Sequence, residues 1–223
     1  MSALADRLAA VQGSIADAAR DAGRHPSQIT TIVVTKFQPA ALVAELAALG
    51  VRDIGENRHQ EAQAKAAELA SLELRWHFIG QLQSKKARQV RAYASAIHSV
   101  DRPGLVEALR SGEASVDCFV QVNLTDDPER GGVAPEGVES LVEQVLGTPG
   151  LRLRGLMAVA PLGEPPRPAF ARMRLLSERV ARTAPEATAL SMGMSHDFRD
   201  AILEGATHLR IGTAITGNRP VAG

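Results

Sequence analysis

The sequence predicts an α/β fold, a single (β/α)8 barrel of the TIM type with an extra helix at its N-terminus. Short β-rich runs alternate with longer stretches of helical period that are rich in Ala, Leu, Glu and Arg, a pattern typical of a parallel sheet. The short runs number eight, as such a barrel requires, and 223 residues are enough for one large core. No linker rich in Pro, Gly and Ser divides the chain, so we expect one domain over 1–223, with the barrel at about 28–219.

The individual elements follow from these patterns in chain order. Leu4, Leu8, Val11 and Ile15 recur at helical spacing and predict the leading helix at about 2–22. The eight strands are predicted at 30–36, 51–57, 74–80, 95–100, 116–123, 151–157, 189–193 and 207–212. Helices are predicted at 40–49, 57–71, 84–93, 102–111, 136–147, 168–183 and 197–204. An open doubly wound sheet is the alternative, but no strand-to-helix turn carries the Gly-x-Gly-x-x-Gly fingerprint of dinucleotide binding, which favours the barrel.

Composition limits the partners. The chain carries 25 Lys and Arg against 25 Asp and Glu, and this zero net charge offers no general attraction to nucleic acid or to an anionic membrane. Charged residues in the leading helix interrupt any signal-peptide core or membrane span, and the single cysteine, Cys118, fits a reducing compartment. No histidine pair has helical zinc spacing with a third ligand nearby. We therefore expect a soluble cytoplasmic protein with no metal and with a small-molecule or protein partner.

A lysine ends the first predicted strand. Alternation along this strand turns Ile32, Val34 and Lys36 toward the barrel interior, and the same parity on the last strand turns Arg210 inward. Burying an ammonium group is costly unless it is paired, neutralised or used in chemistry. We expect Lys36 to lie buried near Arg210 at the C-terminal mouth, where the neighbouring cation favours the neutral, nucleophilic amine.

Two turns are suited to a phosphate group. Barrels frequently bind phosphate on the loops after strands seven and eight. After the seventh strand, Gly193 allows close backbone approach and Ser195 is placed to cap a helix from His196 to about Leu203; after the eighth strand come Gly212 and Thr213. Either turn alone is explained by a helix cap or a chain reversal, but together they favour an anion site. With the lysine, they predict a phosphorylated carbonyl compound held as a Schiff base, either a sugar phosphate or pyridoxal 5′-phosphate (PLP).

Longer motifs carry a family resemblance. The segments are "VVTK", "DIGENRHQEA", "WHFIGQLQSKK", "LRLRGLMAV", "LSMGMSHDFRDAI" and "HLRIGTAITG". Over about residues 28–219 the chain resembles the pyridoxal phosphate homeostasis proteins, the single-domain relatives of the alanine racemase barrel. The resemblance implies a barrel that binds PLP without well-established turnover and keeps vitamin B6 and the linked amino and keto acids in balance.

The resemblance also implies a set of cofactor-binding residues. It assigns the Schiff base to Lys36, the pyridine nitrogen to Arg210, and the phosphate to Ser195, Gly212 and Thr213, with backbone help at Gly193 and Met194. It places Asn57, His77 and Met157 near the cofactor, although a hydrogen-bonded core histidine is an equal explanation for His77. The chain departs from the family pattern at Ile54, Arg58 and Lys85, and the last two leave the charge of the rim open.

The predicted site residues are compatible with three functions. The first is a PLP carrier or reservoir without turnover, expected to be a monomer, with PLP-requiring apoenzymes as possible partners. The second is a PLP enzyme of the racemase or decarboxylase kind, and the third is a Schiff-base aldolase acting on a sugar phosphate. Arg210 is expected to keep the pyridine nitrogen unprotonated, which weakens the electron sink. The related racemases take a second base from a tyrosine on an additional domain, whereas the one tyrosine of this chain, Tyr93, lies on a predicted outer helix. We therefore favour the carrier, with no catalytic residues.

Overall fold

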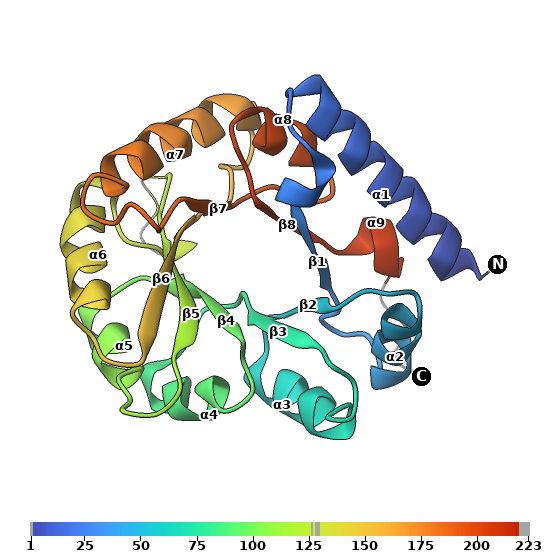
Figure 1. The fold of residues 1–223 in the computed structure, drawn as a ribbon, viewed down its shortest axis with the longest axis horizontal. Helices are drawn as coiled ribbons and strands as arrows, with labels where there is room; N and C mark the ends of the chain where they lie inside the picture. Colours follow the sequence, from blue (N-terminus) through green and yellow to red (C-terminus); the bar gives the residue numbers. More distant parts are fainter. Residues whose placement is uncertain (1, 126, 128–129, 219–223) are drawn as a thin grey trace.

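Eight parallel strands form a closed barrel in the order β1 to β8 (Figure 1). The computed structural model describes residues 2–125, 127 and 130–218, so the last residue of the predicted barrel range lies outside the described residues. The strands are β1 Thr30–Val34, β2 Asp53–Glu56, β3 Arg75–Phe78, β4 Ala96–Val100, β5 Val116–Gln121, β6 Leu151–Met157, β7 Ala189–Ser191 and β8 His208–Ile211. All eight predicted strands are present; β6 has the predicted bounds, and the other seven are shorter because their predicted ends belong to the connecting loops. The predicted barrel is confirmed.

Helices surround the barrel on its outside (Figure 1). They are α1 Ala3–Asp21, α2 Ala40–Ala48, α3 His59–Glu68, α4 Ala87–Arg91, α5 Pro103–Ala108, α6 Val138–Leu146, α7 Pro166–Val180, α8 Phe198–Leu203 and α9 Thr213–Thr216. Short 3-10 turns occupy Pro26–Gln28, Ser84–Lys86 and Pro135–Gly137. The short helix α9 follows β8 directly and was not predicted. In the part of the chain that is described, no helix has the length and apolar character needed to cross a membrane.

The predicted leading helix is α1, which packs against α8 and α9 (Figure 1). Leu4, Leu8 and Ile15 are buried on its inner face, as their helical spacing requires. Arg7 Nε adds a hydrogen bond of 2.7 Å to the carbonyl oxygen of Ile215 in α9. The leading helix thereby supports the loop and helix that follow β8.

Strand alternation divides the core into two layers. Val33, Leu209 and Ile211 belong to the apolar layer between the strands and the surrounding helices. Ile32 of β1 pairs in register with Arg210 of β8, and both side chains take the opposite, inward side. The predicted inward orientation of Arg210 is therefore confirmed.

Candidate ligand site at the barrel mouth

Most of the predicted site residues lie at or beyond the C-terminal ends of strands. Because all eight strands are parallel, these ends form a single rim, the mouth of the barrel. Residues from five strand ends meet there: Lys36 after β1, Asn57 after β2, Met157 at the end of β6, Gly193, Met194 and Ser195 after β7, and Gly212 and Thr213 after β8. Arg210 lies within β8, below this rim.

The side chain of Lys36 is exposed, so the expected burial is wrong. The strand ends at Val34, and Lys36 falls in the turn that leads to α2. Its neighbour Thr35 points outward and is fully buried, with Thr35 Oγ1 donating a hydrogen bond of 2.7 Å to Glu56 Oε1. The turn is thus anchored by the residue before the lysine, while the amine itself reaches solvent at the mouth.

A buried ion pair between Lys65 and Glu56 fixes the backbone at Thr35, where this turn begins. Lys65 of α3 is 5% exposed and Glu56 of β2 is 1% exposed, and Lys65 Nζ lies 2.7 Å from Glu56 Oε1. Lys65 Nζ also donates to the carbonyl oxygen of Thr35 at 2.8 Å. Burial raises the pKa of Glu56, although the hydrogen bonds from Lys65 and Thr35 act in the opposite direction. The pair connects the wall of the barrel to the backbone directly before Lys36.

A second contact holds the backbone after the lysine. The Phe37 N–H donates to Glu61 Oε1 at 2.6 Å, and Glu61 also lies 3.0 Å from Lys65 Nζ. Phe37 has a φ of 65°, in the left-handed region that side chains other than glycine rarely adopt. The guanidinium of Arg58 covers the Phe37 ring at 4.5 Å from its centroid. Arg58, which departs from the family pattern, therefore packs on the turn that contains Lys36. Lys85, which also departs from that pattern, is exposed on the turn before α4.

Arg210 is a buried cation whose hydrogen-bond partners are neutral. Its side chain donates to Ser191 Oγ and to the carbonyl oxygen of Ala158, both at 2.8 Å. Among the described residues, no carboxylate forms an ion pair with it, and burial lowers its pKa to about 10. The guanidinium remains charged at neutral pH, so this position favours a ligand with an electron-rich acceptor atom.

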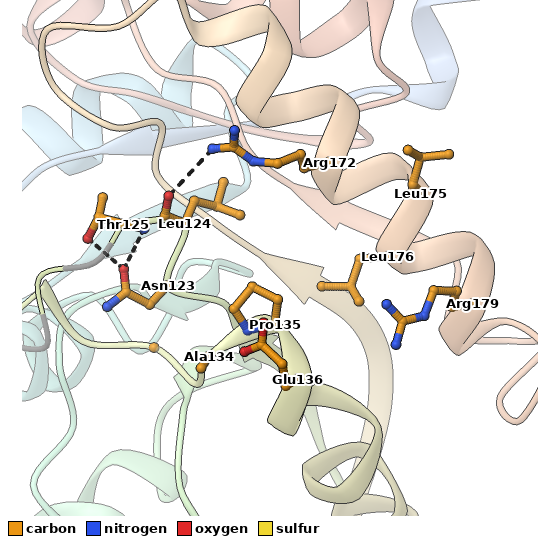
Figure 2. A pocket seen from close by; sticks show the side chains of 11 residues that line it. Asn123, Leu124, Thr125, Ala134, Pro135, Glu136, Arg172, Leu175, Leu176 and Arg179 are labelled. Carbon is orange, nitrogen blue, oxygen red and sulfur yellow. Dashed lines mark hydrogen bonds between the residues drawn. The ribbon is translucent and has the colours of Figure 1, made fainter.

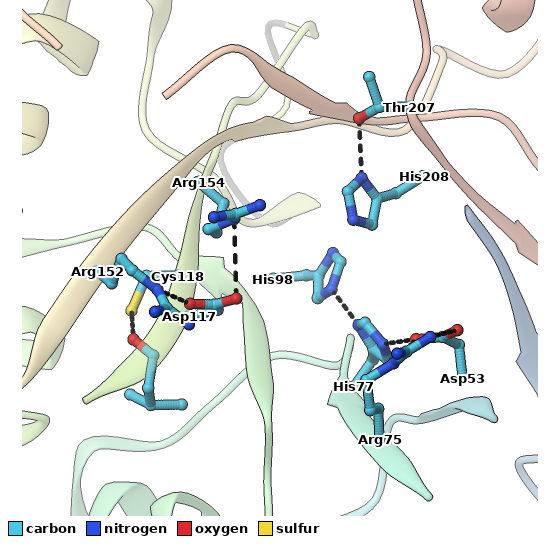
Figure 3. A network of polar contacts seen from close by, with 11 residues as sticks. Asp53, Arg75, His77, His98, Asp117, Cys118, Arg152, Arg154, Thr207 and His208 are labelled. Atoms are coloured by element: carbon cyan, nitrogen blue, oxygen red, sulfur yellow. Dashed lines mark hydrogen bonds and ion pairs between the residues drawn. The ribbon is translucent and has the colours of Figure 1, made fainter. Parts of the chain in front are cut away.

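Ser191 is hydrogen-bonded to the first of two linked interior histidines, His98 and His77, which Figure 3 shows together with Asp53. His98 Nδ1 lies 2.9 Å from Ser191 Oγ, and His98 Nε2 lies 2.9 Å from His77 Nδ1. His77 Nε2 lies 2.9 Å from Asp53 Oδ1. Both ring nitrogens of His77 have protein partners, which agrees with the hydrogen-bonded core histidine that was one of its two explanations. His98 is not among the predicted site residues, although its inward parity inside an apolar strand is a signal that could have identified it.

The loop after β7 differs from its predicted form. Helix α8 begins at Phe198, and its N-cap is Asp197, whose Oδ1 accepts a hydrogen bond from the Met194 N–H. The prediction that Ser195 caps this helix is therefore wrong. Gly193 has a φ of 92°, and a Cβ there would lie 2.6 Å from Ala201 Cβ. Close packing of α8 is by itself sufficient to require glycine at this position.

Donor groups from two loops remain without protein partners. Among the described residues, no acceptor is present for the backbone N–H groups of Ser195, Thr213 and Ala214, nor for the Ser195 hydroxyl. Gly212 leaves room beside these donors, because a Cβ there would come no closer than 3.7 Å to Val34. Hydroxyl and N–H donors on the loops after two neighbouring strands suit an anion.

Asn57 and Met157 complete the mouth. The chain after β3 passes directly against Asn57, since a Cβ on Gly80 would lie 2.3 Å from the Asn57 carbonyl oxygen. Asn57 Oδ1 is buried and has no hydrogen-bond partner in the described structure. Met157 is buried and pairs in register with Ser191, which turns its side chain inward. The orphaned amide oxygen is a second position where a ligand atom would satisfy a buried polar group.

A separate groove lies beside the mouth, between the connection from β5 to α6 and helix α7 (Figure 2). It has a volume of about 670 Å³, and its lining includes Asn123, Thr125, Arg172, Leu176 and Arg179. None of the ten predicted site residues lines it. We place the candidate site at the mouth instead, because the orphaned amide, the buried cation and the unpaired donors are there.

Two further predictions concern residues outside the mouth. Among the described residues, no group of three or more His, Cys, Asp or Glu side chains is arranged to hold a metal ion. Tyr93 follows α4 in the outer layer, where its ring stacks on His59 of α3 at 5.9 Å between centroids. The one tyrosine of the chain therefore lies outside the barrel interior.

The fold and the site define a barrel of the kind that forms the N-terminal domain of alanine racemase, and the family model with that description matches residues 8–220. The pyridoxal phosphate homeostasis protein of Pseudomonas aeruginosa is 44% identical over 226 residues, covering 98% of this chain and 97% of the relative. The Escherichia coli relative of the same name is 38% identical over 229 residues, covering 98% of both chains. This chain belongs to the pyridoxal phosphate homeostasis protein family, which confirms the resemblance.

Solved structures agree with this assignment. PipY from Synechococcus elongatus, determined without PLP, has a TM-score of 0.85 and 38% identity and covers 96% of this chain and 100% of its own. The same protein with PLP bound has a TM-score of 0.82 and 37% identity. Alanine racemase from Corynebacterium glutamicum, at 16% identity and a TM-score of 0.71, shares the fold over 62% of its length.

Proposed function

We propose that this chain binds PLP at the barrel mouth and serves PLP homeostasis as a carrier or reservoir. The observation that carries the proposal is Arg210, a buried cation of β8 whose hydrogen-bond partners are neutral. Lys36 is exposed in the turn after β1, the strand that pairs with β8. The PLP-bound structure of the homologous PipY supports the choice of ligand.

The groups present match the three reactive parts of PLP. When bound, PLP supplies an aldehyde that condenses with an amine, a pyridine nitrogen and a phosphate. Lys36 offers the amine for covalent attachment, and Arg210 offers N–H donors to the pyridine nitrogen. Ser195, Thr213 and the adjacent N–H groups hold the phosphate, and Asn57 and Met157 border the ring. Charge-assisted hydrogen bonds to the phosphate contribute about 1.5–3 kcal/mol each.

The same residues favour storage over turnover. A guanidinium donor cannot protonate the pyridine nitrogen, so it withholds the charge that would make the ring a strong electron sink. Tyr93, packed against His59 in the outer layer, is not placed to act as a second base. The amine of Lys36 is exposed, which suits release of PLP to a PLP-requiring apoenzyme.

The test is reductive trapping. Purified protein is incubated with PLP, reduced with borohydride and mapped by peptide mass spectrometry. We expect a pyridoxyl group on Lys36 and its loss in Lys36→Ala, which keeps the wild-type unfolding free energy within about 0.5 kcal/mol because the side chain is exposed. A label on Lys65, Lys85 or Lys86 in place of Lys36 would refute the assignment.

The absence of useful turnover has its own test. The PLP-loaded protein is incubated with a panel of L- and D-amino acids, and racemisation, decarboxylation and transamination are followed together with transfer of PLP to an apoenzyme. We expect transfer without turnover. A rate of roughly 1 s⁻¹ or more for any amino acid would favour the racemase-like alternative.

A further inference from the structure

The barrel interior contains a line of polar side chains that crosses from the mouth side to the N-terminal end. Figure 3 shows the part of this line that runs from His98 through His77 to Asp53. The line begins at Arg210 and passes through Ser191, His98 and His77 to Asp53, with each contact between 2.8 and 2.9 Å. Asp53 borders a cavity of about 230 Å³ that is lined by residues from the starts of several strands. Of the five residues, only Arg210 belongs to the proposed ligand site.

Asp53 sets the direction of the hydrogen bond at one end. Burial opposes its ionisation, but hydrogen bonds from His77 and Arg75 outweigh this effect and hold the pKa of Asp53 below its usual range. An ionised carboxylate only accepts hydrogen bonds, so His77 Nε2 carries a proton and donates it to Asp53 Oδ1. Arg210 sets the direction at the other end, because its guanidinium can only donate to Ser191 Oγ.

Burial keeps the pKa of His98 well below its ordinary value, so His98 is neutral, and two proton arrangements then connect these ends. In the first, His77 is neutral, His98 Nε2–H donates to His77 Nδ1, and the Ser191 hydroxyl donates to His98 Nδ1. In the second, His77 is doubly protonated and donates to His98 Nε2, so His98 Nδ1–H donates to Ser191 Oγ.

Only the first arrangement satisfies every group. In the second, Ser191 Oγ receives hydrogen bonds from both Arg210 and His98, and no acceptor among the described residues remains for its own hydrogen. Ser191 is fully buried, and a buried donor without a partner is costly. The second arrangement also adds a charge on His77, 2.9 Å from the fully buried His98.

We propose that Asp53, His77, His98 and Ser191 form a hydrogen-bond chain of fixed polarity whose role is to position the guanidinium of Arg210 for the ligand at the mouth. The proposal rests on the proposed function for the identity of that ligand. The four residues are positioning residues, since they act through Arg210. Because each donor is assigned one acceptor, a lone pair of Ser191 Oγ always faces the guanidinium of Arg210. This contact limits rotation of the guanidinium beneath the site.

The polarity is tested without PLP. Heteronuclear NMR of the imidazole nitrogens in the protein at about pH 8 reports which nitrogen of each histidine carries the proton. We expect His77 and His98 to carry it on Nε2 alone. A proton on His98 Nδ1, or a doubly protonated His77, would overturn the assigned polarity.

The positioning role is tested with three variants. Ser191→Ala removes the link to Arg210, and His98→Phe keeps a ring stacked on Phe119, now 4.2 Å from the His98 centroid, but removes both nitrogens. His208→Phe is the matched control, because His208 contacts Phe119 at 5.1 Å and the His98 ring at 6.3 Å between centroids, but hydrogen-bonds to Thr207, outside the chain of four. We expect Ser191→Ala and His98→Phe to speed rotation of the Arg210 guanidinium, measured by NMR, and to weaken PLP binding about fivefold or more, while His208→Phe changes neither.

Failure of this inference is distinguishable from failure of the proposed function. If wild-type protein binds PLP and both test variants bind it equally well with unchanged guanidinium rotation, the positioning role is refuted while PLP binding stands. If wild-type protein does not bind PLP, the proposed function fails, and the two NMR measurements still decide the polarity of the chain and its hold on Arg210. Ser191→Ala, which removes one oxygen atom, provides the answer if His98→Phe does not fold.

Discussion

Lys65 Nζ donates a hydrogen bond of 2.8 Å to the main-chain carbonyl of Thr35, the residue directly before Lys36. The same ammonium group contacts Glu56 at 2.7 Å and Glu61 at 3.0 Å. One lysine, buried behind the barrel wall, therefore fixes the backbone that presents another lysine, exposed at the mouth. Buried ion pairs often contribute little net stability compared with apolar replacements, so their retention here agrees with a role in fixing geometry.

Lys65→Met tests how much the ion pair between Lys65 and Glu56 contributes to the free energy of unfolding. The variant leaves the carboxylate of Glu56, which is 1% exposed, without its cation, and breaking a buried pair in this way costs about 3–5 kcal/mol. We expect a loss of that size in the free energy of unfolding, measured with urea. The matched control is Lys85→Met at an exposed position, expected within about 0.5 kcal/mol of wild type. A loss below about 1 kcal/mol for Lys65→Met would contradict the interpretation.

Two substitutions at Glu61 test the left-handed turn. Glu61→Gln keeps an oxygen that accepts from the Phe37 N–H, whereas Glu61→Ala removes it. Since Phe37 has a φ of 65°, which costs about 1–2 kcal/mol, we expect the turn to relax in the alanine variant alone. Hydrogen exchange at the Phe37 amide should quicken about tenfold in Glu61→Ala and reductive capture of PLP at Lys36 should slow. Equal behaviour of the two variants would show that the Phe37 contact is dispensable.

Gly193→Ala and Gly212→Ala distinguish a glycine that is required for packing from one that is proposed to border the ligand. Gly193→Ala combines a φ of 92° with a contact of 2.6 Å to Ala201, and we expect it to destabilise the fold by about 2–4 kcal/mol. Gly212→Ala meets no atom closer than 3.7 Å, so the free energy of unfolding should change by less than about 1 kcal/mol. If Gly212 borders the phosphate as proposed, the second variant weakens PLP binding at nearly unchanged stability. Unchanged PLP affinity in Gly212→Ala would remove this residue from the site.

Stability should decrease in mildly acidic solution. Burial lowers the pKa of His208 to about 4 and keeps that of His98 well below its ordinary value. Both are neutral in the folded protein but accept protons below about pH 6.5 when unfolded, so their contribution is complete above that pH and declines as the pH falls. For His208 the decline amounts to about 2 kcal/mol at about pH 5. Urea unfolding at about pH 7.5 and about pH 5 should show this difference in wild type and a smaller one in His208→Phe; identical differences would contradict it.

The phosphate group should provide much of the affinity for PLP. Pyridoxal lacks the group that Ser195, Thr213 and the local N–H donors are proposed to hold, so we expect it to bind at least about 100-fold more weakly. The comparison is a titration of each compound followed by absorbance. Ser195→Ala should weaken PLP binding while leaving pyridoxal binding unchanged. Equal dissociation constants for the two compounds would refute the phosphate site.

The alternation of short β-rich runs with helical stretches was sufficient to predict the eight strands, and the period of two along a strand predicted the inward direction of Arg210. Hydrophobic alternation reports which side of a strand faces the core, and this is a local property of the chain. The leading helix was predicted from the spacing of Leu4, Leu8 and Ile15 for the same reason. Local sequence signals were less informative for the loops. Ser195 was expected to cap α8, but the helix begins two residues later than that, so Asp197 occupies the N-cap position.

The polar partners, by contrast, were decided by closure of the barrel. The sequence by itself determined the fold, the family and the set of residues at the mouth, because strand periodicity and long motifs are readable along the chain. It did not determine that Lys65 meets Thr35 from 30 residues away, or that His98 meets Ser191 from 93 residues away. The tertiary structure decided these contacts, because the register of neighbouring strands sets which polar side chains share the small, water-poor space inside and behind the barrel wall. It also decided the exposure of Lys36, because β1 ends two residues before the lysine.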